Sequence, residues 1–407
     1  MAEGAPLIVP AVGMDEHKWV VEADGFASRA ARAAGSGTYR SAVPARIAGL
    51  VLAIPSDLAA DSEEAAAALA GFDAFARGAL GPQGAALGPM SSILLRTEST
   101  SSSQIENLTV GARQLALAEI GQATSANAAV VVGNVRTMEA ALRLAGHLDE
   151  DAIKQMQSEL IPRQPGWEKH AGTYRDQLVW VGASSVSPRG ASYVAPQAQL
   201  VTRAMADLID FIGREDMPVV VQAAIAHAQF ETIHPFADGN GRTGRALVHA
   251  ILKNKGLLTT TTAPVSAGLL HDTRRYFDAL QAYRAGDARP IVERFADASR
   301  YAVHSGSRLV EALSDQLAEA RVKMSAVRPQ ALAWTVLPQL VAQPVINANY
   351  LGDTMGMSDS AAQRALRTLT VTGVLEERTG RQRNRVWQHS GILKVLDDYA
   401  EQIRRDC

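Results

Sequence analysis

The chain almost lacks cysteine, since its single cysteine, Cys407, is the last of 407 residues. Disulfide scaffolds and cysteine-based metal sites are therefore excluded. The sequence also lacks an apolar run of membrane-spanning length, and its first four residues lack the basic region of a signal peptide. Charged residues make up 20% of the chain and the formal net charge is −2, so no global charge points to nucleic acid or a membrane surface. We expect a cytoplasmic protein with no membrane partner.

Two common nucleotide-binding signatures are missing as well. No Gly-Lys pair occurs anywhere in the chain, which excludes a P-loop. Gly239-x-Gly241-x-x-Gly244 matches the dinucleotide fingerprint in form, but that fingerprint needs a preceding strand and an acid about twenty residues later. The preceding segment 218–232 (PVVVQAAIAHAQFET) predicts a helix, with proline in its first turn, and no acid stands at the required distance. A Rossmann site is therefore excluded.

What the chain does contain is a dense set of chemical groups in residues 234–245 (HPFADGNGRTGR). Gly239 and Gly241 flank Asn240 just before a predicted helix over 242–253. Glycine lets backbone N–H groups converge, and such groups at a helix N-terminus attract anions. Arg242 and Arg245 are three apart on that helix, so they can hold successive phosphates. The spacing predicts a polyphosphate-binding loop.

The same segment carries one acid and one base. Asp238 is followed by no other acid until Asp272, and a lone carboxylate beside phosphates suits Mg²⁺, which also takes phosphate oxygens and water. His234 is the local group able to accept a proton near neutral pH. Together these groups indicate nucleotidyl or phosphoryl transfer to a hydroxyl.

These residues resemble the HPFxDGNGRxxR signature of Fic (filamentation induced by cAMP) domain proteins. The preceding AHAQFETI is similar to the helix that leads into that family's loop. Residues 172–182 (GTYRDQLVWVG) and 187–196 (SPRGASYVAP) resemble the family's strand pair, or flap, which holds the target segment. The resemblance extends from about residue 45 to about residue 395. It implies a mainly α fold: a helical Fic core with a short β-hairpin flap, plus a C-terminal winged helix-turn-helix domain.

The resemblance implies a role for each signature residue. His234 would be the general base that deprotonates a Ser, Thr or Tyr hydroxyl of a target protein, and Phe236 would anchor the loop in the core. Asp238 would hold Mg²⁺, with Mn²⁺ as an alternative metal. The remaining ATP-binding residues would be Gly239, Asn240 and Gly241 around the α-phosphate, Arg242 on the β-phosphate side and Arg245 at the γ-phosphate. The implied reaction transfers AMP from ATP to the hydroxyl and releases pyrophosphate.

Three residues have simpler alternatives. Arg245 is either the last phosphate ligand or a surface charge on the helix. His227 lies seven residues before His234 but lacks the spacing and glutamate of a zinc helix, so we expect a buried histidine. Tyr276 resembles a tyrosine of the nucleotide pocket in relatives, yet an aromatic at helical spacing is also typical of a core residue.

A second motif lies upstream, in residues 100–107 (TSSSQIEN). In Fic proteins a [ST]xxxE[GN] pattern marks an inhibitory helix, and here Ser102 and Glu106 fit it. By resemblance, Glu106 would pair with Arg245 and block productive ATP binding. The alternative is a capping box, in which Ser103 and Glu106 start a helix and the glutamate satisfies a backbone donor in its first turn.

The rest of the chain sets the domain organisation. We expect an N-terminal arm (1–45), a Fic helical region with the inhibitory motif (46–125), the catalytic core (126–300), a connecting helix (301–325) and a winged-helix domain (326–407). Composition and periodicity predict helices at 29–34, 54–80, 91–97, 103–120, 125–147, 151–158, 197–213, 218–232, 242–254, 272–284 and 288–321.

The C-terminal region predicts a helix, a tight turn and a second helix with its N-cap at Ser358, followed by a hairpin over 374–387. This resembles the winged helix often joined to Fic enzymes. Its wing and second helix carry polar and basic residues that suit contacts with DNA: Gln363, Arg364, Arg367, Arg378, Arg381, Arg383 and Arg385. The acids Glu376 and Glu377 weaken that patch, and winged helices also serve as protein docking modules.

Three functions follow as hypotheses. The first is a self-inhibited protein adenylyltransferase whose partners are a hydroxyl-bearing protein, including the chain itself, with a homodimer and DNA as further partners. The second is a Fic enzyme that transfers another group or removes AMP. The third is a DNA-binding regulator with a nucleotide-sensing Fic domain.

Overall fold

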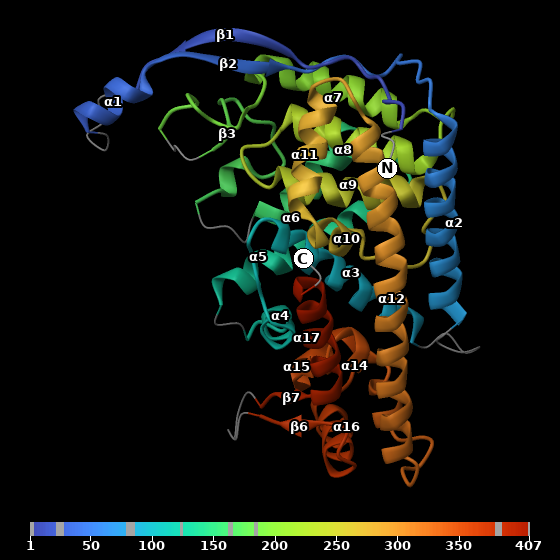
Figure 1. Cartoon of the computed structure of the whole chain (residues 1–407). Coiled ribbons are helices and arrows are strands. Elements are labelled where there is room, and N and C mark those ends of the chain that lie inside the picture. Colours follow the sequence, from blue (N-terminus) through green and yellow to red (C-terminus); the bar gives the residue numbers. More distant parts are fainter. Residues whose placement is uncertain are drawn as a thin grey trace. The chain divides into compact units, whose positions relative to one another are not determined.

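The computed structural model describes residues 4–21, 28–78, 86–122, 125–161, 166–182, 186–378 and 385–405. Most of its helices and strands are labelled in Figure 1. The chain divides into two compact units, and each is discontinuous in sequence. The first comprises residues 1–64, 140–255 and 274–296, and the second 65–139, 256–273 and 297–407. The predicted linear domain boundaries stay a prediction.

The first unit contains the predicted catalytic segment. Its strands are β1 (Gly13–Trp19), β2 (Gly37–Val43), β3 (Trp180–Val181) and β4 (Tyr193–Val194). Its helical elements are α1 (Arg29–Gly35), α6 (Glu150–Leu160), the 3₁₀ helix η2 (Glu168–His170), α7 (Ala198–Ile212), α8 (Val219–Ile233), α9 (Asn240–Asn254) and most of α11 (Thr273–Arg284). The helices α2 (Ser56–Gly78), α5 (Ala126–Leu144) and α12 (Arg289–Lys323) contribute residues to both units.

Helix α8 forms the centre of the first unit. Nearly every one of its residues is buried, as expected for a helix that is apolar around its whole circumference. It packs against α7 and α9. The approach to α9 is close, because a Cβ added at Gly244 would lie 2.9 Å from the ring of Phe230. The segments on either side of the predicted loop are therefore fixed in one packed core.

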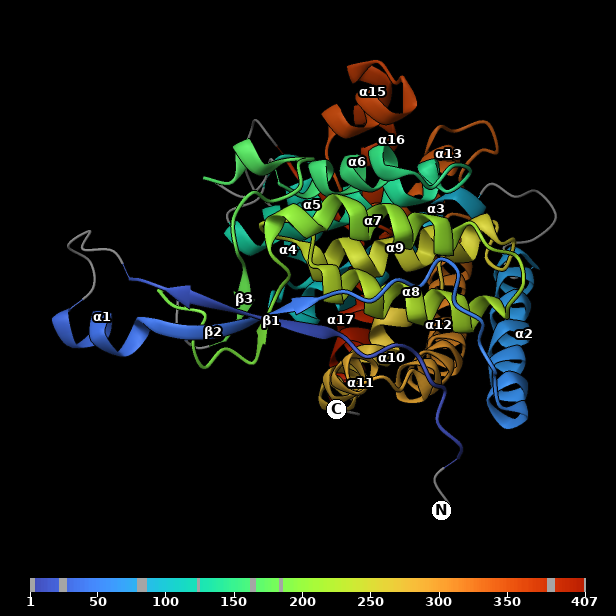
Figure 2. The same ribbon diagram turned by 90° about the horizontal axis from the view of Figure 1, so that it is seen from above.

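The N-terminal arm forms a hairpin that the sequence did not predict. Strands β1 and β2 pair antiparallel from Gly13↔Val43 to Trp19↔Gly37, and α1 lies between them in sequence, at the far end of the hairpin (Figure 2). The segment before β1 is tied to the C-terminal end of α11, where the backbone N–H of Val12 donates to the carbonyl of Arg284 at 2.9 Å. The short helix predicted at 29–34 is confirmed.

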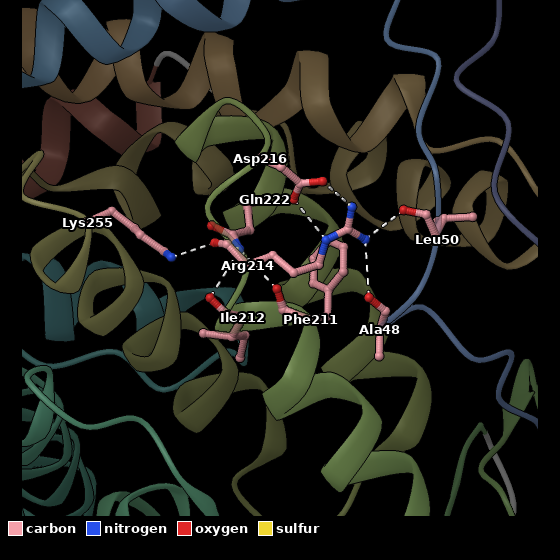
Figure 3. A network of polar contacts seen from close by, with 8 residues as sticks. All are labelled: Ala48, Leu50, Phe211, Ile212, Arg214, Asp216, Gln222 and Lys255. Carbon is pink, nitrogen blue, oxygen red and sulfur yellow. Dashed lines mark hydrogen bonds and ion pairs between the residues drawn. The ribbon is translucent and has the colours of Figure 1, made fainter.

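A polar network ties four segments of the first unit together (Figure 3). Arg214 donates to the carbonyls of Ala48 at 3.3 Å and Leu50 at 2.6 Å and forms a two-point pair with Asp216. The side-chain amide of Gln222 donates to three carbonyls at the end of α7, those of Phe211, Ile212 and Arg214, at 2.9, 3.1 and 2.9 Å. Gln222 thus satisfies the open carbonyls of one helix from the first turn of the next.

In the second unit, α3 (Leu87–Ile105) is one continuous helix. The predicted break between residues 97 and 103 is wrong, and so is the capping box, because Glu106 is the C-cap of α3 rather than a first-turn residue. The hydroxyl of Ser103 donates to the carbonyl of Ser99 at 2.9 Å. Hydroxyls of this kind bond to the preceding turn and let a polar run stay helical while buried. The unit also contains α4 (Ala112–Glu119) and α10 (Val265–His271), of which α10 was not predicted.

The C-terminal part of the second unit contains the predicted pair of helices. These are α15 (Ala348–Met355) and α16 (Asp359–Val371), and the Ser358 side chain caps α16 by accepting from the N–H of Ala361. The strands β5 (Val345–Ile346), β6 (Glu376–Glu377) and β7 (Trp387–Gln388) form one antiparallel sheet in the order β5-β7-β6. The remaining helices are α13 (Ala333–Val336), α14 (Gln339–Ala342) and α17 (Ser390–Arg405). The elements agree with the prediction, while their identification as a winged helix stays a prediction.

Within the described residues, no helix is both long enough and apolar enough to cross a lipid bilayer.

Candidate active site

The loop between α8 and α9 starts with an unusual turn at His234. Helix α8 ends at Ile233, and His234 adopts the left-handed conformation with φ of 51°. Its N–H donates to the carbonyl of Phe230 at 2.8 Å. A left-handed residue followed by proline is a common way to end a helix, because proline cannot continue it. The His-Pro dipeptide therefore turns the chain out of the buried helix at the residue that carries the imidazole.

Arg175 holds this turn in place, and sequence reasoning did not assign it a role. Its guanidinium donates to the carbonyl of His234 at 2.7 Å and to those of Pro196 at 2.7 Å and Gln177 at 2.9 Å. Its backbone N–H donates to the carbonyl of Pro235 at 3.0 Å. Arg175 is buried, and burial lowers its pKa to about 10. One side chain thus joins the loop to both arms of the flap.

The middle of the loop is braced from within. The side chain of Asn240 accepts from the N–H of Phe236 at 2.8 Å and donates to the carbonyl of the same residue at 2.9 Å. Phe236 is fully buried, as the resemblance implied. Gly239 has φ of 81°, and a Cβ there would lie 2.4 Å from the Cδ2 atom of Leu160. Glycine adopts this conformation at little cost, and any larger residue would force the Leu160 side chain to move. The glycine therefore favours this path of the loop.

Helix α9 begins at Asn240, two residues earlier than predicted. Gly241 therefore lies in its first turn, where N–H groups have no partner within the helix. Arg242 and Arg245 are 2% and 3% exposed. This burial excludes the alternative in which Arg245 is a surface charge. The start of α9 combines N–H groups that have no partner within the helix with two buried arginines, and helix starts of this kind bind anions.

Asp238 is the acid of the loop. Its carboxylate lies 3.1 Å from the guanidinium of Arg242, and its side chain is 36% exposed. Across the described ranges, no three His, Cys, Asp or Glu side chains gather as a metal site would need. A single accessible carboxylate fits Mg²⁺ that takes its other ligands from phosphate and water. Asp238 can therefore hold such an ion only together with a phosphate ligand.

His234 carries an uncharged imidazole in the folded protein. Burial is the main cause that lowers its pKa to about 4, and the nearby cations Arg175 and Arg284 contribute to the same shift. The side chain keeps one fifth of its surface exposed, and Nδ1 lies 3.8 Å from the carboxylate of Glu231. The imidazole is therefore neutral at pH 7 and able to accept a proton.

The second histidine of α8 has a different environment. His227 is fully buried, and its Nε2 atom lies 2.8 Å from the hydroxyl oxygen of Tyr276. Burial lowers its pKa to about 3. His227 is therefore a buried neutral histidine, as expected, and Tyr276 is a core residue with 1% exposure.

The flap consists of the two segments that the resemblance indicated. Trp180 pairs with Val194 and Val181 with Tyr193 in an antiparallel ladder. The hydroxyl of Tyr193 donates to the carbonyl of Thr232, and the guanidinium of Arg284 stacks 3.7 Å from the ring centre of Tyr193. The flap is thus attached two residues before His234.

The two residues of the predicted inhibitory motif both belong to the second unit. Ser102 is buried within α3, and Glu106 is half-buried at its C-terminal end, just before the left-handed Asn107 with φ of 61°. Their predicted roles stay predictions.

The basic residues of the wing are partly neutralised. Arg378 lies 3.4 Å from Glu376, and Arg385 is paired with Glu377. Arg381 and Arg383 lie outside the described residues. DNA binding by this region stays a prediction.

Known proteins resemble the part of the chain that contains the loop. The Fic/DOC family model matches residues 147–252. A protein adenylyltransferase, fic-1, of Caenorhabditis briggsae is 34% identical over 137 residues, which is 33% of this chain and 24% of that protein. A probable protein adenylyltransferase of Aquifex aeolicus is 32% identical over 123 residues, or 30% of this chain and 36% of that protein. This chain thus spans about a quarter to a third of the length of these relatives.

Among solved structures, a Fic family protein from Desulfovibrio desulfuricans G20 covers 83% of this chain with a TM-score of 0.51 and 23% sequence identity. The match covers 96% of that protein. This likeness extends the shared fold beyond the segment matched by the family model. The matched segment includes the loop, α8 and most of α9. Residues 147–252 of this chain form a Fic/DOC family domain.

Proposed function

We propose that this protein is an adenylyltransferase that moves AMP from ATP to a Ser, Thr or Tyr hydroxyl of a protein. The observation that carries the proposal is the loop from His234 to Arg245. It joins a neutral, partly exposed imidazole to a helix start with two buried arginines. The names of the relatives, which are protein adenylyltransferases, support it.

In the proposed reaction, ATP binds with its phosphates against the N–H groups of residues 239–241. Arg242 and Arg245 neutralise the outer phosphates by charge-assisted hydrogen bonds. Asp238 would hold Mg²⁺, which, when bound, would neutralise phosphate charge. Because Arg175 and Asn240 fix the backbone of the loop, the protein groups are in place before ATP arrives.

The chemical step is an exchange of two P–O bonds. The target hydroxyl gives its proton to the imidazole of His234, and its oxygen attacks the α-phosphorus. The bond between the α-phosphorus and the bridging oxygen breaks, and pyrophosphate leaves with the electron pair. The low pKa of His234 keeps the ring unprotonated at neutral pH, so one ring nitrogen can accept a hydrogen bond from the hydroxyl before the proton moves.

We further propose that Glu106 inhibits this reaction by pairing with Arg245. The support is the [ST]xxxE[GN] pattern and the position of Glu106 at the C-terminal end of a helix, where the side chain is half-buried. Replacement of Glu106 by glycine would then free the γ-phosphate site.

The test is intact-mass and tandem mass spectrometry of the purified protein after incubation with ATP and Mg²⁺. Glu106→Gly is expected to gain the mass of adenylate on a hydroxyl residue, and more of it than the wild type. His234→Ala or Arg245→Ala in the Glu106→Gly background is expected to abolish the gain. A phosphate increment in place of adenylate would contradict the proposed reaction, and equal labelling of wild type and Glu106→Gly would contradict the inhibitory role alone.

A further inference from the structure

The first unit contains a groove that the proposed chemistry does not use. It has a volume of about 660 Å³ and is lined by parts of the β1–β2 hairpin, by residues 188–194 of the flap and by the end of α11. Figure 2 shows the hairpin beside the flap strand β3. The ATP-binding loop contributes no residue to the lining.

The hairpin is firmly attached to the flap, so the groove is a built feature. The guanidinium of Arg189 donates to the carbonyls of Ala34 at 2.7 Å and Ser36 at 2.6 Å. The hydroxyl of Ser187 donates to the carbonyl of Gly35 at 2.6 Å. The rings of Trp19 and Trp180 meet edge to face at 5.5 Å. These contacts span more than 140 residues of sequence and fix one wall of the groove against the other.

The charge of the groove has one sign. Among its described lining residues, the charged ones are three arginines, Arg40, Arg189 and Arg284. Arg40 is 68% exposed and lies 3.9 Å from Glu16, a separation at which an exposed pair contributes little. Between the arginines the lining mixes polar residues, such as Thr38, Ser192 and Gln281, with apolar ones, and Met14 is 56% exposed. This surface suits a chain segment that alternates acidic and apolar side chains.

We propose that this groove binds an acidic, extended segment of the protein substrate, and that the N-terminal hairpin thereby selects substrates. The choice of occupant rests on the proposed function, because a protein that presents a hydroxyl to His234 must dock near the flap. The groove meets that need: Tyr193 lines it, and the Tyr193 hydroxyl donates to the carbonyl of Thr232, two residues before His234. The mixture of apolar and cationic lining favours a peptide over a nucleic acid backbone.

The test is binding of fluorescein-labelled peptides, measured by anisotropy on the full chain without nucleotide. One probe alternates glutamate and valine, and the other alternates lysine and valine. We expect the acidic probe to bind more tightly, and its binding to weaken as salt rises from about 0.1 M to about 1 M, because the Debye length falls from about 10 Å to about 3 Å. Arg40→Glu and Gln281→Glu, both at exposed groove positions, are each expected to weaken acidic-probe binding by about three- to fivefold.

The control matched to Arg40→Glu is Arg274→Glu, which makes the same Arg-to-Glu change on α11 at a 94% exposed position outside the groove. It is expected to leave binding unchanged. Equal binding of the two peptides, equal loss in the control, or tighter binding of a labelled oligothymidylate strand would overturn the proposal. Since no nucleotide is present, these results are independent of adenylate transfer: absence of labelling in Glu106→Gly contradicts the proposed function, not the groove.

Discussion

Arg175 provides the sharpest test of how the fold prepares its base. Arg175→Met keeps an unbranched, flexible side chain but removes the cation and the donors to the carbonyls of His234, Pro196 and Gln177. A charged hydrogen bond contributes about 1.5–3 kcal/mol, and part of this is offset because methionine needs no desolvation. We expect a loss of about 3 kcal/mol in the free energy of unfolding.

The same change alters the electrostatics of the site. Burial is the main cause of the low pKa of His234, about 4, and Arg175 is one of the two cations that lower it as well, so removal of Arg175 should raise that pKa in part. A shifted His-Pro turn should also slow catalysis by about 10- to 100-fold, because small misplacements of a base are costly. Histidine ring resonances followed by NMR against pH, urea unfolding and the labelling rate measure the three effects.

Arg175→Lys separates the effect of the charge from the effect of the hydrogen bonds. Lysine keeps the charge but cannot donate in a fixed planar fork to several carbonyls. It should retain most of the pKa shift while losing part of the stability. If Arg175→Met leaves the pKa of His234 and the unfolding curve at their wild-type values, the assignment of Arg175 as the residue that positions the base is wrong.

Three further predictions concern the loop and the core. Gly239→Ala is expected to lower the free energy of unfolding by roughly 2–5 kcal/mol, because of the left-handed φ and the contact with Leu160, and to abolish ATP binding measured by calorimetry. The double variant with Leu160→Ala should recover part of the stability, and wild-type ATP affinity in Gly239→Ala would refute the argument. Gln222→Leu removes the donor to three carbonyls at the end of α7 and should lower the free energy of unfolding in urea by about 2–3 kcal/mol. An unchanged midpoint of the urea transition would contradict the role of the network in Figure 3. The pKa values of His227 and His234 are about 3 and about 4 in the folded protein, below the unfolded value near 6.5, so the unfolded chain binds more protons below pH 6.5 and stability falls as the pH falls. From pH 7 to pH 5 the free energy of unfolding should decrease by roughly 4 kcal/mol. A melting temperature that is constant over this range would exclude buried neutral histidines.

The course of the loop in the candidate site was predictable because its information is local, while the roles of its residues stay predictions. The segment 234–245 carries its base, its acid and its cations within twelve residues, and the glycines dictate the backbone path. The start of α8 followed from Pro218, and its predicted end at residue 232 lies one residue before the observed end at Ile233. The pairing of β3 with β4 followed from family resemblance and not from the residues alone.

What was not predictable depends on distant contacts. The strand Gly13–Trp19 is mostly polar and exposed, so no alternation of apolar residues marks it, and its stability depends on the flap and on β2. The run from Thr97 to Ser103 looked like a helix break because hydroxyl residues favour turns. In the folded chain their hydroxyls bond to carbonyls of the preceding turn, and the helix continues. The role of Arg175 likewise depends on carbonyls far away in sequence.

The central claim is that one loop brings ATP and a base together. The measurement that tests it most directly is a crystal structure of the Glu106→Gly variant with ATP and Mg²⁺. We predict the triphosphate against the backbone N–H groups of residues 239–241, with the imidazole of His234 facing the α-phosphorus. A nucleotide bound elsewhere, or an imidazole turned away from the α-phosphorus, would contradict the account.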